Sequence, residues 1–319
     1  AAYLPGAALN GAQRRRVAAR RTLAARGLVE AVTFSFLPSA QAALFGGGSD
    51  ALKLVNPISS DLDAMRPSLL PNLIAAAGRN ADRGFADVQL FEVGPQYAGA
   101  GADEQAQAAA GARVGAVQDR SWAAETRPVD VFDAKADALA VLAALDVPAA
   151  RLQTFRSAPA WYHPGRSGVL GFGPKAILAQ FGEIDPRALK AMGVKGPVAG
   201  FEVFLDVLPA AKRDKGAARP LLKLSAFQPV SRDFAFVADA DVAAEAITRA
   251  ALGADKELIV AATVFDVFSG KGLPEGKKSV AIGVVLQPVD KTLTDAEIEG
   301  IAAKIVAAVA KATGAALRA

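Results

Sequence analysis

Residues 231–237 have the sequence Ser-Arg-Asp-Phe-Ala-Phe-Val and open the last third of this 319-residue chain. Large apolar and smaller or polar residues alternate along the stretch, which predicts a strand with one buried face. The sequence from residue 231 to residue 318 predicts six short elements separated by turn signals. They are strand 231–238, helix 242–252, strand 257–268, strand 278–287, helix 295–312 and short strand 315–318. This βαββαβ order is that of the ferredoxin-like unit.

The last helix is specified at both ends. Thr294 and Glu297 have the spacing of a capping box, and Gly314 provides a stop. Between them the apolar residues recur at helical spacing. These are Ile298, Ile301, Ile305, Val306 and Val309. The sequence therefore predicts a second domain over 221–319, reached through a polar, proline-bounded linker at 209–220.

A first domain is expected over 1–208, because 319 residues exceed the usual size of one core. The predicted strands are 31–37, 52–56, 88–94, 151–157, 168–172, 176–184 and 199–207. Predicted helices are 11–27, the segment from 67 to 84, a helix after Phe132-Asp133, and 186–192. Residues 98–112 lack a periodic apolar face and are predicted to be a mobile loop. Strands that follow one another this often favour an antiparallel sheet, hence an α+β fold.

Composition excludes several classes of site. The chain has no Cys and one His, so thiolate chemistry is excluded and metal binding is not expected. The absence of Cys is typical of proteins in a reducing cytoplasm, which is the expected location. No apolar run approaches the roughly 18 residues that span a bilayer. Residues 221–319 hold 11 Lys/Arg and 12 Asp/Glu, so this region is about neutral. Because non-specific RNA binding needs a basic face, any RNA contact of this region has to use a local group of residues. The start at Ala1, without a signal-peptide pattern, suggests a cut inside a longer chain.

The segment between the two middle strands of the second domain is distinctive. Residues 264–278 have the sequence VFDVFSGKGLPEGKK. Together with 231–237 and the Thr-Leu-Thr-Asp run at 292–295, this segment resembles the ferredoxin-fold anticodon-binding domain at the C-terminus of phenylalanyl-tRNA synthetase beta subunits. Proteins with a βαββαβ order have many different functions, so the resemblance rests on the sequence of these segments and not on the order of the elements.

The first domain resembles the class II synthetase-like module that precedes it in that family. Five segments carry this resemblance. They are 15–17 with 32–36, 56–71 (NPISSDLDAMRPSLLP), 91–94 (FEVG), 162–167 (YHPGRS) and 181–184 (FGEI). The resemblance covers roughly residues 5–319. It implies that the preceding domains of a full beta subunit, including its editing domain, are missing here.

The resemblance implies that this chain carries no catalytic residue and no cofactor. It also implies a holoenzyme of two alpha and two beta subunits that uses ATP and Mg on alpha and binds tRNA(Phe), with no DNA or membrane partner. The residues agree, because a class II site needs arginines that clamp ATP phosphates and the last strand, 201–206, has no Gly-Arg turn. Arg66 and Glu92 are expected to form a buried or interfacial ion pair instead, and His163 to be structural.

The candidate RNA-binding residues are Arg232, Phe268, Lys271, Lys277 and Lys278. Alternation predicts that Phe265 and Val267 point toward the helices, together with Val280, Ile282, Val284 and Leu286. Phe268 would then be exposed, where it could stack on an unpaired base, or it could pack under the hairpin. Phe234 and Phe236 are expected in the core.

Candidate subunit-interface residues come from the first helix and the segment after it. They are Arg14, Arg15, Arg20, Phe34 and Phe36. A helix with a basic exterior can also contact RNA or simply face solvent, but the resemblance places this region at the class II dimerisation surface, which joins beta to alpha.

Two other functions stay open at this stage. The chain could be a self-sufficient ligase with an unrecognised site, which ATP–pyrophosphate exchange by the chain alone would reveal. It could also be a free-standing RNA-binding or regulatory module, which tight binding to unrelated single-stranded RNA would favour.

Overall fold

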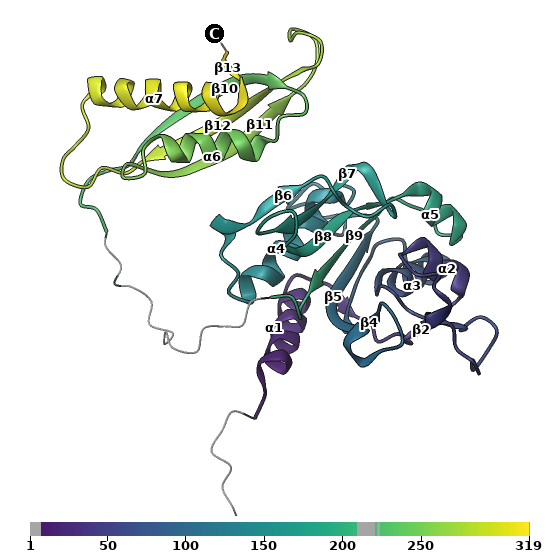
Figure 1. Cartoon of the computed structure of the whole chain (residues 1–319). Helices are drawn as coiled ribbons and strands as arrows, with labels where there is room; N and C mark the ends of the chain where they lie inside the picture. Colours follow the sequence, from purple (N-terminus) through teal and green to yellow (C-terminus); the bar gives the residue numbers. More distant parts are fainter. Residues whose placement is uncertain (1–7, 209–220, 222–223, 319) are drawn as a thin grey trace, which may run out of the picture. The chain divides into compact units, whose positions relative to one another are not determined.

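The chain divides into two compact units, Ala1–Asp214 and Lys215–Ala319, which we call unit 1 and unit 2 and describe separately. The computed structural model describes residues 8–208, 221 and 224–318. Figure 1 shows both units and labels most of their helices and strands. The predicted linker at 209–220 lies outside the described residues, so it stays a prediction.

Unit 1 is built on a seven-stranded sheet with the order β1-β4-β5-β9-β8-β7-β6. The strands are β1 (Val29–Glu30), β4 (Val88–Tyr97), β5 (Gln105–Val114), β6 (Gln153–Phe155), β7 (Tyr162–Gly171), β8 (Ile177–Ile184) and β9 (Val198–Phe204). All neighbours are antiparallel except β1 with β4. The predicted mixed α+β fold with antiparallel sheets is confirmed, while its likeness to class II synthetases stays a prediction.

Helices cover both faces of this sheet. On β5, Ala109 belongs to the apolar cluster under α1 (Gly11–Ala25) and α4 (Val131–Ala144), whereas its neighbours Ala108 and Ala110 belong to the cluster under α3 (Leu70–Ala81). Successive strand residues point to opposite faces, so the two clusters lie on opposite sides. Two shorter helices and a two-stranded sheet complete the unit. They are α2 (Ser39–Leu44), α5 (Pro186–Ala191), β2 (Phe36–Leu37) and β3 (Ala64–Met65).

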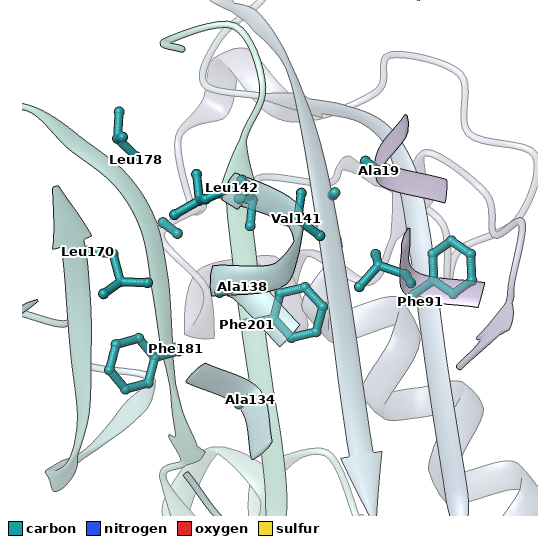
Figure 2. Close-up of a cluster of buried hydrophobic side chains, with 14 of the residues drawn as sticks. Ala19, Phe91, Ala134, Ala138, Val141, Leu142, Leu170, Leu178, Phe181 and Phe201 are labelled. Carbon is teal, nitrogen blue, oxygen red and sulfur yellow. The ribbon is translucent and has the colours of Figure 1, made fainter. Parts of the chain in front are cut away.

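The larger core cluster fills the space between the sheet and α4. Figure 2 shows Ala138 and Leu142 of α4 beside Phe181 of β8 and Phe201 of β9. Small residues on α4, such as the fully buried Ala134, let the helix approach the sheet closely. Each large side chain buried here contributes about 1.5–3 kcal/mol to stability relative to an exposed one. This packing fixes β8 and β9, which carry polar residues on their other face.

The prediction of a mobile loop at 98–112 is wrong. Most of that segment belongs to β5, an interior strand that pairs along its length with β4 and from Ala108 onward with β9. Its residues are small because both faces are covered: a Cβ on Gly111 would lie 2.5 Å from Cε1 of Phe201. Ala and Gly show no apolar alternation, so the sequence lacked the pattern that marks a strand.

The predicted continuous strand 31–37 is also wrong. The structure has only β1 before it and β2 at its end, with irregular backbone between them. Side chains take up the backbone groups there: Asn72 Nδ2 donates to the Phe34 carbonyl at 2.7 Å, and Thr33 N donates to Glu92 Oε2 at 3.3 Å. Backbone bonds to side chains replace the ladder that a strand would need.

The predicted strand 52–56 is replaced by a 3₁₀ helix, Asp50–Leu52, and a single β-bridge between Lys53 and Ala64. Ser49 caps this turn, because its Oγ accepts a hydrogen bond from Ala51 N at 3.3 Å. Such local side-chain bonds compete with strand pairing.

Unit 2 is a four-stranded sheet, β11-β12-β10-β13, with α6 and α7 on one side. Its elements are β10 (Val230–Asp239), α6 (Ala244–Ala254), β11 (Ile259–Phe268), β12 (Lys277–Leu286), α7 (Asp295–Thr313) and β13 (Ala316–Leu317). The predicted βαββαβ order is confirmed. Thr294 and Glu297 form the predicted capping box, and Gly314 ends α7 in the left-handed conformation. Phe234 and Phe236 are buried, as predicted.

The predicted faces of β12 are confirmed, but those of β11 are partly wrong. Val280 and Ile282 are fully buried under the helices. A β-bulge between Val264 and Asp266 inserts one residue into β11 and shifts its alternation. Val264 therefore packs toward the core, whereas Phe265 stays 61% exposed.

Candidate RNA and subunit interfaces

Arg66 and Glu92 form the ion pair that the sequence predicts, deep inside unit 1. Nη1 of Arg66 lies 2.8 Å from Oε1 of Glu92, and the two side chains are 2% and 5% exposed. Arg66 Nε also donates to the Pro95 carbonyl at 2.9 Å, and Thr33 Oγ1 donates to the second oxygen of Glu92 at 2.7 Å. Gly94 leaves room for the guanidinium, since a Cβ there would lie 2.8 Å from Nη2. This guanidinium is therefore engaged inside the protein.

A second buried carboxylate, Glu202 on β9, is bound from both sides. Ser68 Oγ donates to its Oε1 at 2.6 Å, and Gln180 of β8 donates to its Oε2. Burial raises the pKa of Glu202, and it raises the pKa of the fully buried Tyr162 well above its ordinary value, with the charge of Glu202 as a further cause. Sequence analysis missed this cluster. Its one signal was a polar residue, Gln180 or Glu202, within the largely apolar sequence of each strand, and the register places these two residues directly opposite each other.

The three arginines predicted at a subunit interface bind within unit 1. Arg15 Nη1 donates to the Leu205 carbonyl at 2.9 Å, and Arg14 Nη1 donates to the Leu9 carbonyl at 3.1 Å. Arg20 forms an ion pair of 2.7 Å with Glu30. These contacts attach α1 to its own unit, and the interface role of the arginines stays a prediction.

The two predicted interface aromatics lie at an apolar surface beside β2. Phe34 is 65% exposed and Val32 is 89% exposed. Together with Phe36 and Leu37 they line a pocket of about 580 Å³, which also reaches Arg79 of α3. We call Val32, Phe34, Phe36 and Leu37 the β2 surface. Val32 and Phe34 are exposed, Phe36 is half-buried and Leu37 is buried. Neighbouring exposed apolar side chains such as Val32 and Phe34 are typical of protein–protein contacts.

The hairpin end of unit 2 brings four of the five predicted RNA-binding residues into one region. Phe268 is 40% exposed, and its ring lies against the turn, 3.3 Å from a Cβ placed on Gly270. Lys277 forms an ion pair of 2.6 Å with Asp239, and Lys278 Nζ donates to the Ala240 carbonyl at 2.9 Å. The ring of Phe268 is thus supported from below by its own hairpin and still partly open. Lys271 is exposed in the same hairpin.

Arg232 does not join this group. It pairs in register with Val284, five residues along β12 from Ser279, the partner of Phe268. At about 3.3 Å per strand residue, that separation is roughly 16 Å. Sequence analysis also missed Phe265, which lies on the open sheet face, 3.9 Å from a Cβ placed on Gly283. The bulge that exposes it has no clear sequence signal.

Other classes of site find little support in the described residues. No group of three or more His, Asp or Glu side chains that could hold a metal ion occurs among residues 8–208 and 224–318. His163 Nδ1 accepts a hydrogen bond from Gly165 N at 3.0 Å, within the irregular first part of β7. In the same part of the chain, no helix has the length and apolar character needed to cross a membrane.

Comparison with known families covers nearly the whole chain. The family model described as the phenylalanyl tRNA synthetase beta chain CLM domain matches residues 1–205. The chain belongs to the phenylalanyl-tRNA synthetase beta chain family. A second model, the ferredoxin-fold anticodon binding domain, matches residues 225–318, which is unit 2 as the structure describes it.

Curated relatives agree with this family. The chain is 56% identical over 315 residues to the phenylalanine–tRNA ligase beta subunit of Rhodospirillum rubrum, and 58% identical over 315 residues to that of Paramagnetospirillum magneticum. In both cases the match covers 99% of this chain and 39% of the relative. This member of the family therefore spans about two fifths of the length of the beta subunits that it matches.

Proposed function

We propose that this chain is a non-catalytic part of a phenylalanine–tRNA ligase beta subunit. Unit 1 supports the catalytic alpha subunit, and unit 2 binds tRNA(Phe) through the anticodon region. In the assembled enzyme, of two alpha and two beta subunits in the cytoplasm, aminoacylation takes place on alpha, and ATP and Mg²⁺ bind there. The observation that carries the proposal is the engagement of Arg66, which leaves this charge no access to a nucleotide.

The polar groups of unit 1 support its non-catalytic role. A site that activates an amino acid has to present guanidinium groups to ATP phosphates in an accessible cavity. Arg66 is paired with Glu92 in the interior, and both oxygens of Glu202 accept hydrogen bonds from neighbouring side chains. These groups satisfy one another, which is what a buried polar network needs for stability.

The β2 surface supports contact with a protein partner. It combines exposed apolar side chains with a pocket large enough for several side chains of a partner, and Asp61 and Arg79 are the charged residues of the pocket lining. Aromatic residues in pockets of this kind provide much of the energy of subunit contacts. The family's other subunit is the partner that we propose for it.

The hairpin end of unit 2 supports contact with single-stranded RNA. Phe268 and Phe265 are partly exposed aromatic rings, and Lys271 and Lys277 lie on or beside the hairpin. Aromatic side chains stack on unpaired bases, and nearby lysines attract phosphates. An anticodon loop presents unpaired bases of this kind.

The test uses the 319-residue chain on its own and with an alpha subunit. We expect the immobilised chain to retain a purified alpha subunit of a bacterial phenylalanine–tRNA ligase and to bind a tRNA(Phe) transcript. We expect it to show no ATP–pyrophosphate exchange without alpha. Exchange by the chain alone would contradict the proposal and restore a self-sufficient ligase.

The second candidate is a free-standing RNA-binding module. The exposed aromatics of unit 2 favour it as much as they favour tRNA binding, because stacking is tolerant of sequence. Equal affinity for a tRNA(Phe) anticodon stem–loop and an unrelated single-stranded RNA, together with no retention of alpha, would support it. Preference for the stem–loop and retention of alpha would exclude it.

A further inference from the structure

A second basic site lies in unit 1, on the side of the sheet that α3 covers, where Val194 packs against Gly78. A pocket of about 520 Å³ opens between α5, the turn that follows it and the strand residues Arg166 and Glu183. Its floor is apolar, formed by Ile184, Leu189 and other side chains that are buried or half-buried. Three cationic side chains stand around this floor. They are Arg166, Lys190 and Lys195.

The charges around the pocket leave an excess of positive charge. Glu183, the carboxylate among the lining residues, is paired with Arg166 at 2.6 Å. Asp185, just outside, is paired with Arg187 at 2.8 Å, and this pairing lowers the pKa of Asp185 to about 2. Both acids are therefore matched by arginines. Lys190 and Lys195, which are both exposed, are the other two cations among the lining residues.

The turn that carries Lys195 is held firmly against α5. Gly193 adopts the left-handed conformation at the end of the helix, and its N–H donates to the Lys190 carbonyl at 3.1 Å. Val194 N donates to the Leu189 carbonyl at 3.0 Å. Gly196 lies so close that a Cβ on it would be 2.6 Å from Leu189 Cδ1. The two lysine backbones are thus fixed relative to each other before any ligand arrives.

We infer that this pocket binds the sugar–phosphate backbone of RNA, with Lys190 and Lys195 on phosphates and the apolar floor against a ribose. Two exposed cations beside an apolar floor suit a polymer in which charged phosphates and sugars alternate. Lysine ammonium groups contact phosphates as point charges and release counterions when they do so. The inference rests on the proposed function, because it supposes that the partner is tRNA, and it places a contact outside unit 2.

The experiment compares two RNAs and three forms of the 319-residue chain. The RNAs are a tRNA(Phe) transcript and its isolated anticodon stem–loop. The proteins are the wild type, the double variant Lys190→Ala with Lys195→Ala, and the control Lys175→Ala, which removes one exposed charge elsewhere in unit 1. Binding is followed by fluorescence anisotropy across a salt series, with thermal melts to check the fold.

We expect the double variant to bind the whole tRNA roughly tenfold more weakly at low salt, with the slope of log K against log salt reduced by about 1.5. Its affinity for the stem–loop should equal that of the wild type, and Lys175→Ala should change neither. If the wild type binds the stem–loop and the double variant binds whole tRNA as tightly as the wild type, this inference fails alone. If the wild type binds neither RNA, the proposed function fails with it.

One more probe separates RNA from a free nucleotide. ATP alone is titrated into the wild type and the double variant. Binding of ATP that depends on the two lysines, with unchanged tRNA affinity, would overturn the inference and show a nucleotide pocket instead. Equal or absent ATP binding by both forms, with weakened tRNA binding, is the expected result.

Discussion

Arg66 and Glu92 face each other in the interior of unit 1, with 2.8 Å between Nη1 and Oε1 and no more than 5% of either side chain exposed. Each charge is removed from water, so each depends on the other for its stability. The same guanidinium reaches the Pro95 carbonyl, which ties the segment after β3 to β4. An arginine used in this way stabilises the fold and is not available to a substrate.

Removal of Arg66 should therefore damage stability before anything else. We expect Arg66→Ala to lower the free energy of unfolding of unit 1 by roughly 3–5 kcal/mol, because Glu92 would be left as an unpaired buried charge. Both tryptophans, Trp122 and Trp161, lie in unit 1, so their fluorescence in a urea titration reports on that unit. The exposed Arg79→Ala is the control and should change stability by less than about 1 kcal/mol. A stable Arg66→Ala chain would show that the pair has no structural role.

The pKa of Glu202 makes unit 1 sensitive to alkali. Because burial raises that pKa, the contribution of Glu202 to stability is present below its ordinary value and is lost as pH rises through the raised value. Glu202→Gln keeps the size of the side chain and removes the charge. We expect the variant to lose less stability than the wild type between pH 5 and pH 8.5 in thermal melts followed by tryptophan fluorescence. Parallel melting curves for the two proteins over that range would contradict this assignment.

The β2 surface can be tested by reversing its polarity. Phe34 is 65% exposed, so Phe34→Asp should leave the fold intact and weaken retention of the alpha subunit at least tenfold, because a charge would enter an apolar contact. The measurement is surface plasmon resonance with immobilised chain. Phe132→Asp is the matched control: it is 69% exposed and lies on α4, which covers the other face of the sheet from α3. Equal weakening by both variants would remove the β2 surface as the specific contact.

Glu297 should make unit 2 sensitive to acid. The ion pair with Lys291 and the hydrogen bonds from Thr294 lower the pKa of Glu297 to about 2. Its stabilising effect is present above its ordinary pKa and is lost as pH falls toward 2. Glu297→Gln can keep the capping geometry without the charge. We expect calorimetry to show a smaller acid-induced drop in the melting temperature of unit 2 for this variant, and an identical drop in both proteins would refute the role of the charge.

The sequence predicts unit 2 better than unit 1 because its elements are locally specified. The α7 cap and the alternation of β12 are visible in the residues themselves, and both are confirmed. In unit 1, the sequence does not predict β5. Both faces of this strand are covered, so it has Ala and Gly where Phe201 and the helices pack against it, and these small residues show no strand pattern. Tertiary packing, which a single sequence does not display, decided that element.

The candidate site shows the same division. Residues 264–278 mark the hairpin, and the structure places Phe268 and three lysines there. The exposure of Phe265 could not be predicted, because a one-residue bulge reverses the face of every residue after it. Arg232, the fifth candidate, lies apart from the hairpin because the register of β10 pairs it with Val284.

The most direct test is the affinity of the 319-residue chain for an isolated tRNA(Phe) anticodon stem–loop, measured by fluorescence anisotropy. We expect Phe268→Ala to weaken binding by roughly five- to hundredfold, since stacking on one base contributes about 1–3 kcal/mol. Phe132→Ala in unit 1 should bind as the wild type does, and Phe234→Ala should unfold unit 2 because that ring is buried. Wild-type affinity in both Phe268→Ala and Phe265→Ala would contradict anticodon binding by this face of unit 2.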